Sequence, residues 1–212
     1  MQRRFMFQCV LTLGLLVNPA LMAPVWANGE AADAFVKRIT TDVYETLRTD
    51  KAIQAGDMNR IIALVDNKIM PNVNFQRMTA SAVGPGWRQA TPEQQKRLQE
   101  EFKTLLVRTY AGALTQVNDQ VVSFKPLRAN PEDKEVVVRT EVKGRGEPIQ
   151  LDYRLEKTSD ASGAWKIYDL NVLGAWLVQT YKTQFAQEIN AKGIDGLIAT
   201  LAERNKSNAR KN

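Results

Sequence analysis

The spacing of apolar residues changes part-way along the chain, near Val121, from the 3.6-residue period of helices to the two-residue period of strands. In 135–143 valines alternate with polar or charged residues, and 148–157 repeats this pattern. Such alternation predicts strands with one buried and one solvated face. Further strands are predicted at 121–127 and from Trp165 onward.

The fourth of these strands changes phase in its middle. Trp165 and Ile167 share its first inward face, whereas Leu170 and Val172 are the apolar positions that follow. One extra residue turns every later side chain to the opposite face, so the pattern predicts a bulge near 168–169.

Helical periodicity flanks the strands. Apolar residues recur at helical spacing in 30–48, 57–70 and 91–113, and two further helices are predicted at 176–191 and 195–201. Thr91-Pro92-Glu93-Gln94 has the sequence of a capping box with proline in the first turn. Helices, four sequential strands and helices again predict an α+β domain, in which helices cover one face of a four-stranded antiparallel sheet.

The first 27 residues have the three zones of an export signal. Two arginines precede an apolar run at 5–17, and small residues occupy Val25 and Ala27, the −3 and −1 positions of a cleavage site. The run is shorter than the roughly 20 residues that span a membrane. We therefore expect cleavage after Ala27 and one mature domain, 28–212; an uncleaved anchor is the alternative. Cys9 lies inside the apolar run, which argues against a lipoprotein.

Composition excludes several kinds of catalysis. The chain has no histidine, and its single cysteine belongs to the predicted signal. Ser-His and Cys-His nucleophile systems are therefore absent, and nearly all zinc sites are excluded. Catalysis would have to rest on carboxylates, lysine or tyrosine. A mature domain without disulfides depends on its hydrophobic core for stability.

Basic residues exceed acidic ones, giving a formal charge of +6, or +4 without the two arginines of the signal. Most charges alternate in sign, except in a basic tail at about 204–212 with Arg204, Lys206, Arg210 and Lys211. The tail could contact anionic lipid headgroups or an acidic partner, although a frayed, solvated terminus is the simpler expectation. Nucleic-acid binding is not expected, since the chain has no RNP-like or zinc-finger pattern.

Periodicity alone does not separate a ligand cavity from a solid core. The apolar strand faces and the aromatic residues of the helices are suitable cavity walls, but an ordinary core requires the same residues and is favoured on this evidence. Asp169, near Tyr168 or Tyr110, is a candidate acid–base group. A capping or turn role for Asp169 is the simpler interpretation.

Two stretches resemble the MlaC family, also called the toluene-tolerance auxiliary family. The first comprises residues 87–94 (WRQATPEQ) and 107–110 (VRTY). The second runs from 165–170 (WKIYDL) to 193–198 (GIDGLI). The stretches follow the family's order along essentially the whole mature chain, whereas 171–175 departs from its pattern.

The resemblance implies a hollow, NTF2-like α+β domain that binds phospholipid in the periplasm. Its expected function is to shuttle lipid between the inner and outer membranes and so maintain outer-membrane lipid asymmetry. Implied partners are phospholipid, an inner-membrane ABC transporter complex with its substrate-binding membrane component, and an outer-membrane lipoprotein–porin complex. We expect a monomer with no cofactor, metal or catalytic residue, and with phospholipid as its cargo.

The lipid-binding walls are expected at apolar positions facing the space between sheet and helices. The strand positions are Val136, Val138, Val142, Ile149, Leu151, Tyr153, Leu155, Trp165 and Ile167. The helical positions are Val73, Phe75, Leu105, Leu106, Tyr110, Trp176, Val178, Tyr181 and Phe185. Arg88, Arg108 and Lys182 are speculative contacts for the lipid phosphate.

Two other functions fit the same pattern. One is an NTF2-like isomerase or dehydratase that uses tyrosine and aspartate in a cone-shaped pocket. The other is an interaction module with a solid core. The enzyme predicts a small pocket with a buried carboxylate near Tyr168 or Tyr110, whereas the lipid carrier predicts a long apolar cavity.

Overall fold

The computed structural model describes residues 30–117, 119–130, 132–144, 146–160 and 163–210. The helices before the sheet are α1 (Ala32–Thr49), α2 (Lys51–Gln54), α3 (Met58–Leu64), α4 (Phe75–Val83) and α5 (Pro92–Thr115). A π-helical turn, Val65–Ile69, and two 3₁₀ turns, Met70–Asn72 and Gly84–Arg88, connect them. The strands are β1 (Val121–Phe124), β2 (Glu135–Lys143), β3 (Ile149–Lys157), β4 (Trp165–Val172) and β5 (Ala175–Trp176), followed by α6 (Leu177–Ala209).

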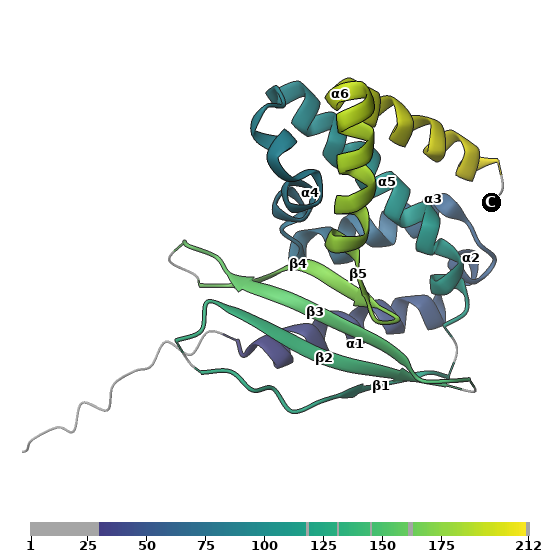
Figure 1. Cartoon of the computed structure of the whole chain (residues 1–212). Coiled ribbons are helices and arrows are strands. Elements are labelled where there is room, and N and C mark those ends of the chain that lie inside the picture. Colours follow the sequence, from purple (N-terminus) through teal and green to yellow (C-terminus); the bar gives the residue numbers. More distant parts are fainter. Residues whose placement is uncertain (1–29, 118, 131, 145, 161–162, 211–212) are drawn as a thin grey trace, which may run out of the picture.

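The sheet is antiparallel throughout, with its strands in chain order (Figure 1). The α+β class is confirmed, but the sheet has five strands in place of the predicted four. The additional strand, β5, pairs with the end of β4 through a two-residue turn, Leu173-Gly174, in which both residues have positive φ. This geometry matches a tight hairpin, and leucine is an uncommon residue at its first position, which is why the sequence did not reveal the hairpin.

The predicted bulge is present in β4. Arg154 pairs with Asp169 but its neighbour Leu155 pairs with Ile167, so Tyr168 is the additional residue. Because of this shift, Leu170 lies on the same apolar face as Ile167.

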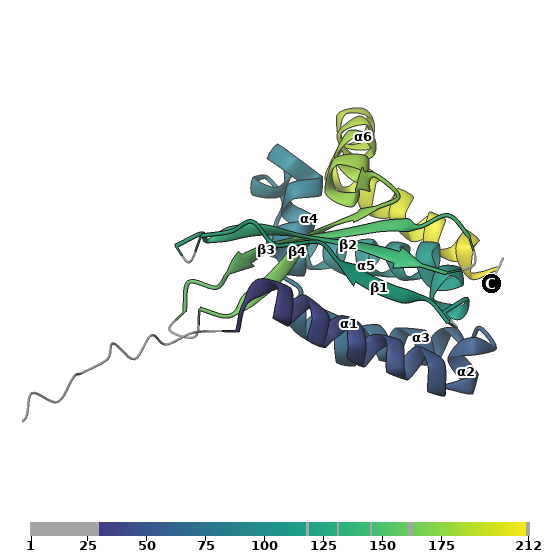
Figure 2. The same ribbon diagram turned by 90° about the horizontal axis from the view of Figure 1, so that it is seen from below.

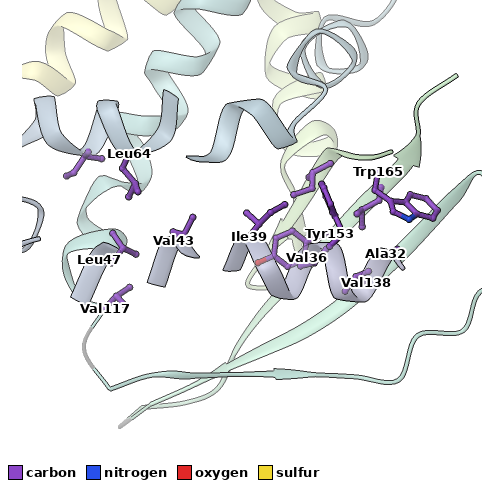
Figure 3. Packing of buried hydrophobic residues seen from close by; sticks show 14 of the residues in the cluster. Ala32, Val36, Ile39, Val43, Leu47, Leu64, Val117, Val138, Tyr153 and Trp165 are labelled. Carbon is purple, nitrogen blue, oxygen red and sulfur yellow. The ribbon is translucent and has the colours of Figure 1, made fainter. Parts of the chain in front are cut away.

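Helix α1 covers the apolar face of the sheet. Its buried residues include Phe35, Ile39, Val43 and Leu47, which recur at helical spacing and form one stripe. They pack with valines of β2 and with Tyr153 and Trp165, as Figure 3 shows for part of this group. We call this buried group the sheet cluster; Figure 2 shows α1 and α3 along the same side of the sheet.

Buried residues of α2 and α3 also belong to the sheet cluster, whereas α4, α5 and α6 form a second buried group, which we call the helical cluster. Helices α4, α5 and α6 meet around Phe102, whose ring lies 4.9 Å from that of Tyr181 and 5.2 Å from that of Phe185, edge to face in both pairs. Figure 1 shows these helices gathered beyond the β4 edge of the sheet. The molecule therefore has two apolar cores that meet at β4.

Short polar side chains cap several of the helices, and the sequence predicts the cap at Thr91. Asp57 accepts hydrogen bonds from the N–H groups of Asn59 and Arg60, and Asn74 accepts one from Arg77. Thr91 and Gln94 form the reciprocal capping box at the start of α5. Each cap satisfies N–H groups that have no partner within the helix.

The C-terminal element α6 is two helices that meet at Gly193, where the backbone is non-helical, with φ 71° and ψ −174°. Glycine readily adopts positive φ, so the chain changes direction there, between the two predicted helices. The helix extends through the basic tail to Ala209. Residues 1–27, the predicted signal, lie outside the described residues. Within the described ranges, no helix combines the length and hydrophobicity needed to cross a bilayer.

Candidate functional site

The sheet cluster and the helical cluster meet at Val73 and Leu170, which are half-buried and pack against both groups. Other half-buried apolar residues lie beside one cluster or the other, among them Leu151 against the sheet cluster and Leu106 and Tyr110 against the helical cluster. We call the contact zone at Val73 and Leu170 the seam. Both side chains are apolar and keep part of their surface exposed, which makes the seam the candidate for contact with an apolar ligand.

Strand β4 holds the two parts together beside the seam. Val73 forms a parallel bridge with Ile167, and the N–H of Asn74 donates to the Ile167 carbonyl at 2.8 Å. Arg77 of α4 pairs with Glu135 of β2 at 2.7 Å and with Glu156 of β3. These contacts fix the start of α4 to the sheet.

Arg77 also stacks on an aromatic ring of the polar sheet face. Its guanidinium carbon lies 3.6 Å from the centroid of the Tyr168 ring, and the Tyr168 hydroxyl donates to Glu135 at 2.9 Å. The Arg77 guanidinium holds the pKa of Glu135 below its ordinary value. The bulged residue Tyr168 is therefore part of the attachment of α4.

Asp169 attaches α6 to the same strand. One carboxylate oxygen accepts from the N–H groups of Leu170 at 2.9 Å and Val178 at 3.0 Å, and the other accepts from Arg154 at 3.0 Å. Burial raises the pKa of Asp169, although the Val178 N–H and the Arg154 charge act in the opposite direction. One oxygen joins β4 to the first turn of α6 and the other accepts from Arg154 of β3, so Asp169 has a capping role and not that of a free general base.

The structure brings most of the predicted wall residues into the two clusters. Those in the sheet cluster, or packed against it, are Val136, Val138, Leu151, Tyr153, Leu155, Trp165 and Ile167. Those in the helical cluster, or packed against it, are Phe75, Leu105, Leu106, Tyr110, Val178, Tyr181 and Phe185. Val73 belongs to the seam.

Three predicted wall residues lie elsewhere. Trp176 precedes α6, and its ring stacks against the Arg154 guanidinium, whose carbon lies 3.9 Å from the ring centroid. Ile149 is 42% exposed at the end of the sheet, and its partner Val142 is buried but belongs to neither cluster. Trp176 is on the polar side because β5 pairs it with Asn171.

The predicted wall residues do not include Leu170. This residue is an inward position of its strand and joins the two clusters. The buried stripe of α1 was recognised as a helix face, but nothing in its spacing indicates which surface it covers. The bulge was the signal that could have identified Leu170.

The three speculative phosphate contacts are not brought together. Lys182 and Arg88 are both exposed, and Lys182 lies beside Gly84 at the start of the 3₁₀ turn that ends at Arg88. Arg108 instead lines a hollow between α5 and α6.

A second hollow of about 300 Å³ lies near Tyr168, Glu135 and Arg139 on the polar side of the sheet. Neither hollow is at the seam, so an enclosed apolar cavity between the layers remains a prediction.

The described part of the chain contains no group of three or more carboxylates or cysteines placed to hold a metal ion. Several of its carboxylates are in ion pairs, such as Asp42 with Lys68 and Glu188 with Lys192. The candidate site is thus an apolar contact zone rather than a cluster of ionisable groups.

Comparison with known proteins assigns the chain to a family. The model of the MlaC protein family matches residues 37–203. The chain belongs to the MlaC family. The match includes the seam, the helical cluster and all of the sheet cluster except its first residues in α1.

Individual MlaC relatives agree over most of their length. The toluene tolerance protein ttg2D of Pseudomonas putida is 28% identical over 88% of this chain and 86% of its own. The intermembrane phospholipid transport system binding protein MlaC of Haemophilus influenzae is 25% identical over 92% of this chain and 88% of its own. A phospholipid-binding protein from Ralstonia solanacearum, solved in complex with a phospholipid, is 47% identical with a TM-score of 0.81, over 84% of this chain and 98% of that one.

Proposed function

We propose that this protein binds a phospholipid with its acyl chains at the seam. The observation that carries the proposal is the meeting of two apolar cores at half-buried Val73 and Leu170. An acyl chain inserted there would contact apolar side chains on both sides. The name of the Haemophilus relative and the phospholipid in the Ralstonia structure support this choice of ligand.

The physical chemistry of the seam suits a diacyl ligand. Burying each CH₂ group of an acyl chain contributes about 0.8 kcal/mol, so two chains supply a large favourable free energy. Apolar contacts are non-directional, and the side chains at the seam can exchange contacts with each other for contacts with lipid. The polar attachments through Asn74, Arg77 and Asp169 would keep β4 joined to α4 and α6 during this exchange.

The finer proposal is a carrier that moves phospholipid between the inner and outer membranes and maintains outer-membrane lipid asymmetry. We place the mature domain, 28–212, in the periplasm after cleavage at Ala27, as a monomer. Its partners would be an inner-membrane ABC transporter complex with its substrate-binding membrane component and an outer-membrane lipoprotein–porin complex. Binding and release, without covalent chemistry, would be sufficient for this role.

Native mass spectrometry tests the ligand directly. The full-length chain, expressed with its predicted signal and purified from the periplasmic fraction without detergent, should begin at Asn28 and carry mass corresponding to diacyl phospholipid. Protein that is empty, and stays empty after incubation with phospholipid vesicles, would overturn the proposal. The N-terminal mass tests export independently of lipid binding.

A further inference from the structure

A hollow of about 320 Å³ lies between α5 and the C-terminal half of α6. Both views of the fold show the yellow end of α6 running alongside α5 (Figures 1 and 2). Ala202 and Ala209 of α6 are seven residues apart and face this groove, and their short side chains leave it unfilled. The long side chains of Arg97, Glu101 and Arg108 line it from α5.

The hollow has an excess of positive charge. Arg97, Arg108 and Lys206 line it together with one acid, Glu101, which gives a formal balance of three positive charges to one negative. Glu101 is already engaged, because Arg97 lies 3.2 Å from one of its oxygens and the Asn205 amide donates to the other at 2.8 Å. Lys206 forms no ion pair with the rest of the described chain.

Asn205 supplies an independent indication of a ligand. Its side chain lines the hollow and the residue is only 5% exposed. Its Nδ2 donates both to the Glu101 carbonyl at 2.9 Å and to the Glu101 carboxylate, and these two acceptors fix the orientation of the amide. Its Oδ1 is buried without a hydrogen-bond partner among the described residues. A buried acceptor without a donor is unfavourable, so this oxygen favours a ligand that carries a donor.

We propose that this hollow binds a phosphate group that carries a hydroxyl or ammonium donor. The three cations would bind the phosphate oxygens, and arginine has a donor geometry suited to phosphate. The hydroxyl of a protonated phosphate, or the donor of a phosphoglycerol or phosphoethanolamine group, would satisfy Asn205. The site shares no residue with the seam, so its failure would leave the proposed lipid binding unaffected.

A phosphate titration of the purified protein, followed by ¹H–¹⁵N correlation NMR at constant ionic strength, tests the site. Inorganic phosphate and glycerol 3-phosphate should give saturable shifts in the amides of 97–108 and 202–209. The double variant Arg97→Gln/Lys206→Gln should weaken binding about tenfold or more, because two charge-assisted contacts are lost. Lys37→Gln, which removes an exposed lysine of α1, is the matched control and should bind as the unaltered protein does.

Absence of saturable shifts, or equal affinity in the double variant, would overturn the proposal. Vesicle flotation then separates the two sources of phosphate. If protein floats with phosphatidylglycerol vesicles but not with phosphatidylcholine, and the double variant does not float, a lipid headgroup is the source. Saturable phosphate binding without flotation supports the site and assigns it to a free phosphate compound. Flotation that persists in the double variant would overturn a role for the hollow in membrane contact.

Discussion

At the scale of single residues, Tyr153 places a phenol inside the sheet cluster. Burial raises the pKa of Tyr153 to about 12, although hydrogen bonds with Thr40 and Thr140 act in the opposite direction. The unfolded chain loses this proton near pH 10, whereas the folded chain retains it. The stabilisation is therefore complete below about pH 10 and declines as pH rises towards 12, by about 1.4 kcal/mol at pH 11. In urea unfolding, Tyr153→Phe should lack this decline; curves that stay parallel from pH 8 to 11 would contradict the prediction.

The same residue shows how far sequence reasoning extends. Alternation in β3 correctly predicts that Tyr153 is buried beside Leu151 and Leu155. It does not predict the threonine partners, because Thr40 comes from α1, which is distant in sequence. Burial follows from local period, whereas the partners of a buried polar atom depend on tertiary packing.

At the scale of elements, one carboxylate determines how α6 meets the sheet. Asp169 is 1% exposed, accepts two backbone N–H groups and pairs with Arg154. Asp169→Ala leaves those buried donors without a partner and should lower the free energy of unfolding by about 2–3 kcal/mol. Hydrogen exchange at the Val178 amide should accelerate as well. Asp42→Ala is the control: it removes an exposed ion pair with Lys68 and should cost less than about 1 kcal/mol. Equal effects of the two substitutions would show that Asp169 is not the attachment.

Elements marked by a short sequence pattern could be predicted. Elements that depend on an unusual backbone conformation or on tertiary packing could not. The capping box at Thr91 and the bulge at Tyr168 follow from short patterns that the structure confirms. Strand β5 could not be predicted because Leu173, with a φ of 54° and 71% exposure, adopts a backbone conformation that leucine rarely takes. Nor could the sequence show that α4, α5 and α6 pack beyond the β4 edge, since that depends on where α6 is attached.

At the scale of the whole molecule, the chain is two apolar cores joined along β4. The sheet with α1, α2 and α3 forms one core, and α4, α5 and α6 form most of the other. Polar attachments join β4 to α4 through Asn74 and to α6 through Asp169, and apolar contacts lie at the seam. In the proposed function, this arrangement would allow the apolar contacts at the seam to change while the hydrogen-bonded attachments persist. It also identifies Leu170 as the residue whose substitution should affect the proposed lipid binding most.

Leu170→Glu tests that arrangement. A carboxylate at the seam would have to be desolvated by an inserted acyl chain, which is unfavourable without a partner. We expect co-purified phospholipid, quantified by native mass spectrometry, to fall about tenfold or more, since each factor of ten corresponds to ~1.4 kcal/mol.

The matched control is Val121→Glu, which makes the same charge change on the same sheet at a residue that is 64% exposed, and it should retain lipid. Circular dichroism and thermal unfolding would verify that both variants are folded. If folded Leu170→Glu carries as much lipid as the unaltered protein, the acyl chains bind elsewhere; if Val121→Glu also loses lipid, the effect is not specific to the seam.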